Sequence, residues 1–305
     1  MRTYQISAAD RRPLPQRYRD EPRHLGYCDD ELERPFAHHF RQEVEPIQRH
    51  AIDALLAGRA PSEFGYEVDE VVDHLSRPGY DALETGWTRT SRGTLAVSCL
   101  TDMPGVTAQM WDWWFGWHSR DSARYKLWHP GAHQFAAIGD DRSSDRSLSD
   151  RQRYHDNVSY VDEYVGQSLS HLAIRFLDPA RVGFDEQPGV THICARLGTS
   201  NFPVGAGWLV HQVRPTDGGS EMRSRFFLGH PEIMGLPPTS TSNPAVSRVL
   251  TSRAGRNALK PVIAAISRHQ MGNHLGRALV NHCATEMNHL ATFLADLYAE
   301  FRDYP

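Results

Sequence analysis

The stretch that most constrains the fold lies near the C-terminus, where residues 281–289 read NHCATEMNH. A helix turns about 100° per residue, so His282, Glu286 and His289 fall within an arc of about 60°. Six apolar residues share this side of the helical wheel, namely Met271, Leu275, Leu279, Leu290, Phe293 and Leu297. The polar trio therefore interrupts the face that a terminal helix would bury against a core.

A carboxylate on this buried face needs a group that offsets its charge. Burying an uncompensated charge costs more free energy than the marginal stability of a domain supplies. One solution is a metal ion bound by Glu286 and its flanking imidazoles, with zinc favoured by nitrogen-rich ligation. The other is a metal-free network in which a neutral histidine bonds the glutamate and His289 packs at an edge. The H-x-x-x-E spacing alone leaves both open.

The length, charge and cysteine content of the chain limit the class of protein to which it can belong. A chain of 305 residues can form one large domain or two, and its formal charge of -4 argues against a nucleic-acid partner. The four cysteines have no C-x-x-C spacing, so neither a paired-cysteine zinc site nor a disulfide framework is expected. The N-terminus has no apolar signal segment, and no run reaches the length of a membrane span. We expect a reduced, soluble, cytoplasmic protein.

Residues 1–88 are interpreted as an N-terminal arm and helical region. Residues 1–35 are rich in Arg, Asp and Pro, and they predict an extended arm that is disordered or wraps a partner subunit. Two helices are expected after it, over residues 36–57 and 68–75, the second ending before Pro78-Gly79.

Residues 89–305 are interpreted as one domain of the α+β class. A strand is predicted over 93–101 and an aromatic helix over 106–118. Further strands are predicted over 124–129, 134–138, 157–166, 169–177, 190–197, 205–214 and 221–229, with loops over 140–153 and 230–247. A helical stretch follows over 259–301, with a break near Gly272-Asn273. This order indicates a curved antiparallel sheet that grips a long C-terminal helix.

The remaining metal ligands should come from strands that face this helix. His129 and His133 flank a strand break at Pro130-Gly131, and such breaks redirect side chains. Asp162 and Glu163 interrupt a run that otherwise favours a strand, and alternation does not decide which of the two faces inward. His129 is also consistent with a surface histidine before proline, which is the favoured interpretation from its position alone.

Two later strands carry further histidines, His192 and His211. Alternation places His211 on the same face as Leu209, where either a core histidine or a catalytic one fits. Arg223 and Arg225 are expected to face solvent or to bind an anion. The chain has no H-E-x-x-H helix, G-x-S-x-G elbow, G-x-G-x-x-G turn or Walker loop, so serine hydrolases and nucleotide-dependent enzymes lose their main support.

Four blocks of sequence resemble the 2,4-diacetylphloroglucinol hydrolase family, which also includes phloretin hydrolases. They are MWDWWFGWH at 110–118, RYKLWHP at 124–130, EMRSRF at 221–226 and HCATE at 282–286. The resemblance spans residues 85–300. It implies a helix-grip fold of the START and pathogenesis-related type, with the N-terminal region used to form a homodimer.

The resemblance also implies a zinc ion held by two histidines and two glutamates. The helix ligands match His282 and Glu286, and the remaining carboxylate matches Glu163. The strand histidine matches His133, with His129 as the second choice. His289 is not one of the family's metal ligands, and we expect it to contact the ligands rather than the metal.

Two neighbouring positions bear on the substrate. The family tyrosine eight residues before the strand histidine matches Tyr125, which we expect to contact a phenol oxygen. The family's substrate-binding Asn, three residues after that histidine, is replaced by Ala136. This departure leaves the metal site intact and sets the shared acylphloroglucinol substrate in question.

The implied reaction is hydrolysis of a C–C bond between an acyl carbonyl and an electron-rich ring or a 1,3-dicarbonyl carbon. The ring carbon gains a proton and leaves as a stabilised enolate, while zinc polarises the acyl oxygen or activates water. Tyr125, His129 and His211 are the candidates for moving the proton.

Two other functions fit the same pattern. One is a non-catalytic carrier of hydrophobic ligands, and the other is a metal-dependent cyclase or decarboxylase of a biosynthetic pathway. Zinc is the preferred ion, although sites with two histidines and two carboxylates also hold manganese or iron.

Overall fold

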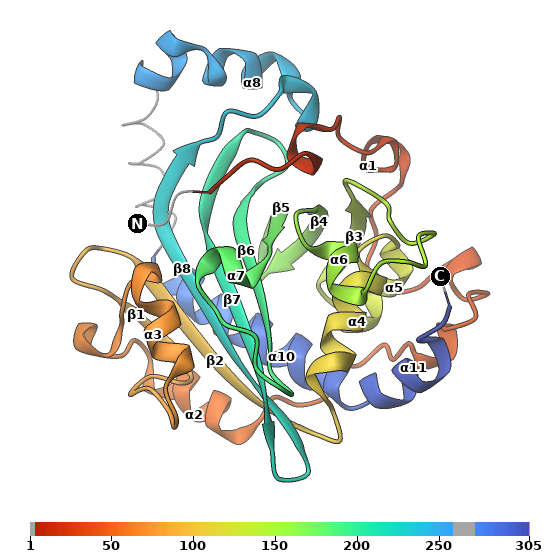
Figure 1. Cartoon of the computed structure of the whole chain (residues 1–305), viewed down its shortest axis with the longest axis vertical. Coiled ribbons are helices and arrows are strands. Elements are labelled where there is room, and N and C mark those ends of the chain that lie inside the picture. Colours follow the sequence, from red (N-terminus) through yellow and green to blue (C-terminus); the bar gives the residue numbers. More distant parts are fainter. Residues whose placement is uncertain (1–3, 259–271, 305) are drawn as a thin grey trace.

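One eight-stranded sheet dominates the computed structural model, which describes residues 4–258 and 272–304 (Figure 1). The strand order is β1-β2-β8-β7-β6-β5-β4-β3, and every neighbouring pair is antiparallel. The strands are β1 Gly86–Arg89, β2 Leu95–Pro104, β3 His133–Ile138, β4 Val158–Val165, β5 Ser168–Leu177, β6 Thr191–Thr199, β7 Val204–Thr216 and β8 Gly219–Ile233. The predicted antiparallel sheet with a C-terminal helix is confirmed.

The helices surround this sheet. In chain order they are α1 Gln16–Asp20, α2 Arg49–Ala57, α3 Val71–Ser76, α4 Ala108–His118, α5 Ser122–Trp128, α6 Asp150–Tyr154, α7 Pro179–Val182, α8 Pro244–Thr251, α10 Asn273–Ala291 and α11 Leu294–Phe301. Residues 259–271 of the predicted C-terminal helical stretch, including Met271, lie outside the described residues, and α10 begins where the break was expected. In the described ranges no helix combines the length and hydropathy needed to cross a membrane.

The long helix α10 packs on the inner face of the sheet, and in Figure 1 it lies behind the strands. Its contacts are mainly with β1 and β2, and its side chains Val280, Cys283 and Met287 are fully buried. Gly276 permits this close approach, because a Cβ atom there would lie 2.4 Å from the Trp87 ring. Burial of this apolar side fixes which face of α10 is presented to β3 and β4.

The outer face of the sheet is covered by N-terminal residues. Tyr4, Leu14 and Tyr18 are buried, and the ring of Tyr18 meets the ring of Phe135 on β3 edge-on with centroids 5.4 Å apart. The predicted arm therefore packs on the chain's own sheet. Both faces of the sheet are buried, so most strand residues contribute to one core or the other.

Two predicted elements are wrong. Over residues 36–57 only Arg49–Ala57 is α-helical, because Pro46 disfavours a helical conformation at the residue before it. The predicted strand at 124–129 is instead helix α5, which begins after the Asp121 side chain accepts a hydrogen bond from the Ala123 amide. All seven residues of α5 are buried, so its sequence shows no amphipathic period.

Smaller corrections concern segments predicted as loops or left unassigned. Strand β1 had no sequence signal, and the predicted loop 140–153 contains the start of α6. The predicted loop 230–247 includes the end of β8 and the start of α8. The helix at 106–118 and the strands at 157–166 and 169–177 are confirmed within a few residues.

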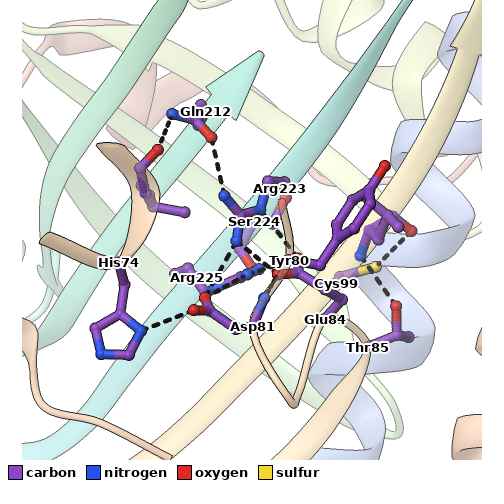
Figure 2. A network of polar contacts seen from close by, with 12 residues as sticks. His74, Tyr80, Asp81, Glu84, Thr85, Cys99, Gln212, Arg223, Ser224 and Arg225 are labelled. Atoms are coloured by element: carbon purple, nitrogen blue, oxygen red, sulfur yellow. Dashed lines mark hydrogen bonds and ion pairs between the residues drawn. The ribbon is translucent and has the colours of Figure 1, made fainter. Parts of the chain in front are cut away.

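Arg223 and Arg225 on β8 are buried on the outer face, so the predicted alternative in which they face solvent is wrong (Figure 2). Each guanidinium bonds Glu84, at 2.6 Å for Arg223 and 2.7 Å for Arg225, and each lies 3.2 Å from Asp81. These charge-assisted bonds attach the segment before β1 to the sheet. Ser224, between the two arginines, points to the inner face instead.

Candidate metal centre

Four buried side chains from three elements converge under α10. The Nε2 atom of His133 lies 3.7 Å from a Glu163 oxygen and 3.4 Å from a Glu286 oxygen. The Nε2 atom of His282 lies 3.6 Å and 3.7 Å from oxygens of the same two carboxylates. One ligand atom from each of His133, Glu163 and His282 lies within 4.8 Å of the other two. Each imidazole thus faces both carboxylates, as ligands around a single cation do.

The fold brings these four residues together through two local rules. His133 and Glu163 are directly paired across β3 and β4, so their side chains share the inner face. His282 and Glu286 are four residues apart on α10 and therefore lie on one side of the helix. The ladder has an irregularity just after His133, at the predicted break.

Alternation along β4 sends Asp162 to the outer face. Its carboxylate accepts bonds from Tyr18, at 3.1 Å, and Arg23, at 2.7 Å, and lies 2.8 Å from His171 Nδ1. Asp162 therefore anchors the N-terminal arm, whereas Glu163 faces the converging histidines. The sequence had left this choice open.

The tautomer of His133 is set by its other ring nitrogen. Nδ1 donates a hydrogen bond to the Tyr125 carbonyl at 3.0 Å, so the lone pair of the neutral ring is on Nε2. Nε2 is buried and has no hydrogen-bond partner within the described residues. A lone pair directed at two carboxylates is repulsive unless a proton or a cation lies between them, and the donor set fits a zinc ion.

Burial determines the electrostatics of the centre. It raises the pKa of Glu163 to about 7, although the Tyr125 hydroxyl opposes the shift, and it raises the pKa of Glu286 well above its usual range, with Glu163 adding to the effect. Burial also lowers the pKa of His282 to about 4 and that of His133 well below its ordinary value. The protein alone thus disfavours every charge here, and a bound cation would reverse this for the carboxylates.

Tyr125 on α5 completes one wall of the centre. Its hydroxyl donates a short hydrogen bond to Glu163, and its ring stacks on His133 with centroids 3.8 Å apart. Burial raises the pKa of Tyr125 well above its usual range, so the phenol keeps its proton at neutral pH. Helix α5, which lies where a strand was predicted, determines where this side chain points.

The other candidate histidines lie around the centre or away from it. His129 stacks on His282 with ring centroids 5.2 Å apart, but it is outside the group of converging donors. His289 accepts a hydrogen bond from the Glu45 amide at Nδ1 and so ties α10 to the N-terminal region. His192 stacks on Phe184 on the outer side of the sheet and is a core histidine.

A cavity of about 480 Å³ opens beside the converging donors. Glu163, His282 and Glu286 form part of its wall, together with Tyr125. His211 also lines it, on the predicted face, and its Nδ1 lies 2.7 Å from the Ser224 hydroxyl. Ala136 is buried in the core and is not among the lining residues.

Sequence reasoning missed several polar residues of this cavity, among them His118 and Ser170. His118 lines it, and its Nδ1 donates a 2.7 Å hydrogen bond to the Trp114 carbonyl, which leaves Nε2 as the acceptor. Ser170 lines it from β5, opposite Glu163 in the strand ladder. His118 could have been identified from its place at the end of the tryptophan-rich block. No sequence feature indicated Ser170.

A second cluster of metal-ligating side chains already contains a cation. His24, Cys28 and Glu31 converge in the N-terminal region, and the buried ammonium of Lys126 lies 2.7 Å from both His24 and Glu31. This lysine belongs to the block at 124–130. It attaches the N-terminal region to α5, and a metal ion has no place beside it.

Comparison with known proteins shows the family to which the chain belongs. The family model described as the DAPG hydrolase PhiG domain matches residues 64–299, which include every residue of the converging set. The chain belongs to this family. The matched range starts ahead of residue 85 and contains α3 and β1.

Curated relatives from this family cover most of the chain. A 2,4-diacetylphloroglucinol hydrolase from a Pseudomonas species is 30% identical over 277 residues, which are 88% of this chain and 88% of the relative. The corresponding enzyme of Pseudomonas protegens is 30% identical over 88% of this chain and 85% of its own length. The phloretin hydrolase of Eubacterium ramulus is 30% identical over 70% of this chain and 84% of its own length. The chain is therefore a hydrolase of this family.

Proposed function

We propose that this protein is a zinc-dependent hydrolase that cleaves the C–C bond between an acyl carbonyl and an electron-rich ring or a 1,3-dicarbonyl carbon. The supporting observation is the convergence of two buried imidazoles and two buried carboxylates, three of which line a cavity with aromatic walls. The names of the relatives, hydrolases of 2,4-diacetylphloroglucinol and phloretin, support the substrate class.

We assign the metal to His133, Glu163, His282 and Glu286. Two features favour a divalent cation. The Nε2 atom of His133 has no hydrogen-bond partner within the described residues, and the pKa of both carboxylates is raised. A bound zinc ion supplies a Lewis acid for the acyl oxygen and lowers the pKa of bound water toward about 7. The packing of α10 on the inner face of the antiparallel sheet also supports the helix-grip interpretation of the fold.

The reaction adds the hydroxyl of water to the acyl carbon and a proton to the ring carbon, so the products are a carboxylic acid and the free ring. Tyr125 is the residue we place against a phenol oxygen of the substrate, because its protonated hydroxyl borders the cavity beside Glu163. His129 and His211 remain the candidates for passing the proton. Burial lowers the pKa of His211 to about 3, so it acts as a neutral imidazole.

The test is a turnover assay with zinc-loaded protein on mono- and diacetylphloroglucinol and on a 1,3-diketone. We expect one acetic acid for each acetyl group removed from the ring, loss of activity with a chelator, and recovery with zinc. Tyr125→Phe should keep its zinc and lose about 10- to 100-fold in kcat/KM, because it lacks the hydrogen bond between the Tyr125 hydroxyl and the phenol group of the substrate.

Tyr80→Phe is the matched control, since the Tyr80 hydroxyl bonds Glu221 and Tyr80 is 62% exposed. This variant should retain wild-type turnover. Tight binding of acylphenols by zinc-loaded protein without release of any acid would refute hydrolysis and favour the carrier.

A further inference from the structure

The side chains that line the cavity fall into two groups by burial, a buried group that holds the aromatic rings and a partly exposed group of leucines, and we call these groups its inner and outer halves. Its inner half is aromatic and fully enclosed, with Phe115, Trp128 and Phe176 at 2–5% exposure. Its outer half is aliphatic and partly open, with Leu169 at 42% exposure and Leu172, Leu197, Leu275 and Leu279 half-buried. The hydrogen-bonding imidazoles of His118 and His211 are both in the buried set. A planar, hydroxylated ring therefore fits the inner half better than the outer half.

The outer half follows α10 away from the candidate metal ligands. Leu279 precedes His282 by three residues and Leu275 precedes it by seven, so this wall extends about 10 Å from the ligand along the helix. An acetyl group at the metal would leave these side chains facing water. Among the described residues that line the cavity, the acids Glu163 and Glu286 are the charged ones, and both belong to the candidate metal centre.

We infer that the substrate of this hydrolase carries a long unbranched acyl chain, which lies along the leucines of the outer half while the ring occupies the inner half. This inference rests on the proposed function and adds the substrate class. Its physical basis is burial of methylene groups against leucine side chains, which gains affinity in proportion to the apolar area covered. A chain with a charged end would find no partner there.

The experiment uses acylphloroglucinols that share one ring and carry straight acyl chains from acetyl to octanoyl. Each buried methylene should raise kcat/KM about threefold to fourfold until the chain passes Leu275. A profile that is flat, or that falls beyond acetyl while acetyl is hydrolysed, would overturn the inference and leave the proposed hydrolase intact. Absence of hydrolysis at every chain length would refute the proposed function, and the inference with it.

A second measurement separates binding from chemistry. Alkylresorcinols of increasing chain length have no acyl bond, so their dissociation constants, measured by calorimetry, should fall by the same factor per methylene. Leu275→Asn should flatten this dependence. Leu56→Asn is the matched control, because Leu56 is 76% exposed on α2 and should keep the wild-type slope. Equal slopes in the two variants would contradict the assignment of the chain to the outer half.

Discussion

Glu163 is a carboxylate whose burial disfavours its charge and which belongs to the candidate metal centre. It is buried on a strand, faces Glu286 and two imidazoles, and has a pKa of about 7 because burial disfavours its charge. Its neighbour Asp162 is also buried but is satisfied by Tyr18 and Arg23 on the opposite face. Asp162 has the guanidinium of Arg23 as a cationic partner, whereas Glu163 faces imidazoles whose pKa is lowered by burial. The cation that we propose would offset the charge of Glu163.

The pKa of Glu163 gives a pH-dependent prediction for metal-free protein. Because the folded-state pKa is raised from 4.5 to about 7, the protonated form is favoured, and its stabilisation is present below pH 4.5 and lost as the pH rises through 7. Glu163→Gln is uncharged throughout, so its stability relative to wild type should increase by about 3 kcal/mol between pH 4.5 and 7.

Denaturant unfolding in the presence of a chelator measures this difference across the pH range. With zinc bound, the same substitution should destabilise the protein, since it removes a ligand. A pH-independent difference between the metal-free proteins would show that Glu163 does not carry the raised pKa.

Predictions about single residues succeeded where they depended on the geometry of one secondary-structure element. The helical period alone placed His282 and Glu286 on one side of a buried helix, and they lie there. The pairing of His133 with Glu163 depends on the β3–β4 register, which no local pattern states. The position of His289 against the Glu45 amide depends on N-terminal residues far away in the sequence.

At the scale of elements, the main error was the strand predicted over residues 124–129. Burial of this segment on all sides explains the error. Helix α5 is enclosed by the core and by N-terminal residues, so its apolar and polar residues show neither a helical nor a strand period. The solvent-facing alternative for the arginines of β8 is wrong for a related reason. Alternating Arg residues indicate a solvated face unless acids from another element cover it, and here the segment with Asp81 and Glu84 does so.

The arginine–acid network predicts a large stability effect at Glu84. Glu84→Ala would leave two guanidiniums, each 1% exposed, with Asp81 as their remaining acidic contact in this network, so we expect a loss of about 3 kcal/mol in unfolding free energy. Asp53→Ala is the control, because its ion pair with Arg49 is exposed and should change stability by less than about 1 kcal/mol. Equal effects of the two substitutions would contradict a structural role for the network.

At the scale of the whole molecule, the sheet and α10 together form the candidate centre. The order of elements predicted a large antiparallel sheet and a C-terminal helix, and both are confirmed. The packing of the arm on the chain's own sheet was not predictable, because arms of this composition also occur free or on partner subunits. The homodimer, the boundary at residue 88 and the cytoplasmic location stay predictions.

The most direct test of the account is the metal content of purified protein, measured by elemental analysis after incubation with zinc and removal of the unbound ion. We expect one zinc per chain in the wild type and in His192→Ala, whose histidine packs on Phe184 outside the centre. Glu286→Ala and His133→Ala should each lose most of the bound zinc. A metal-free wild type, or full zinc occupancy in Glu286→Ala, would contradict a cation held between α10 and the sheet.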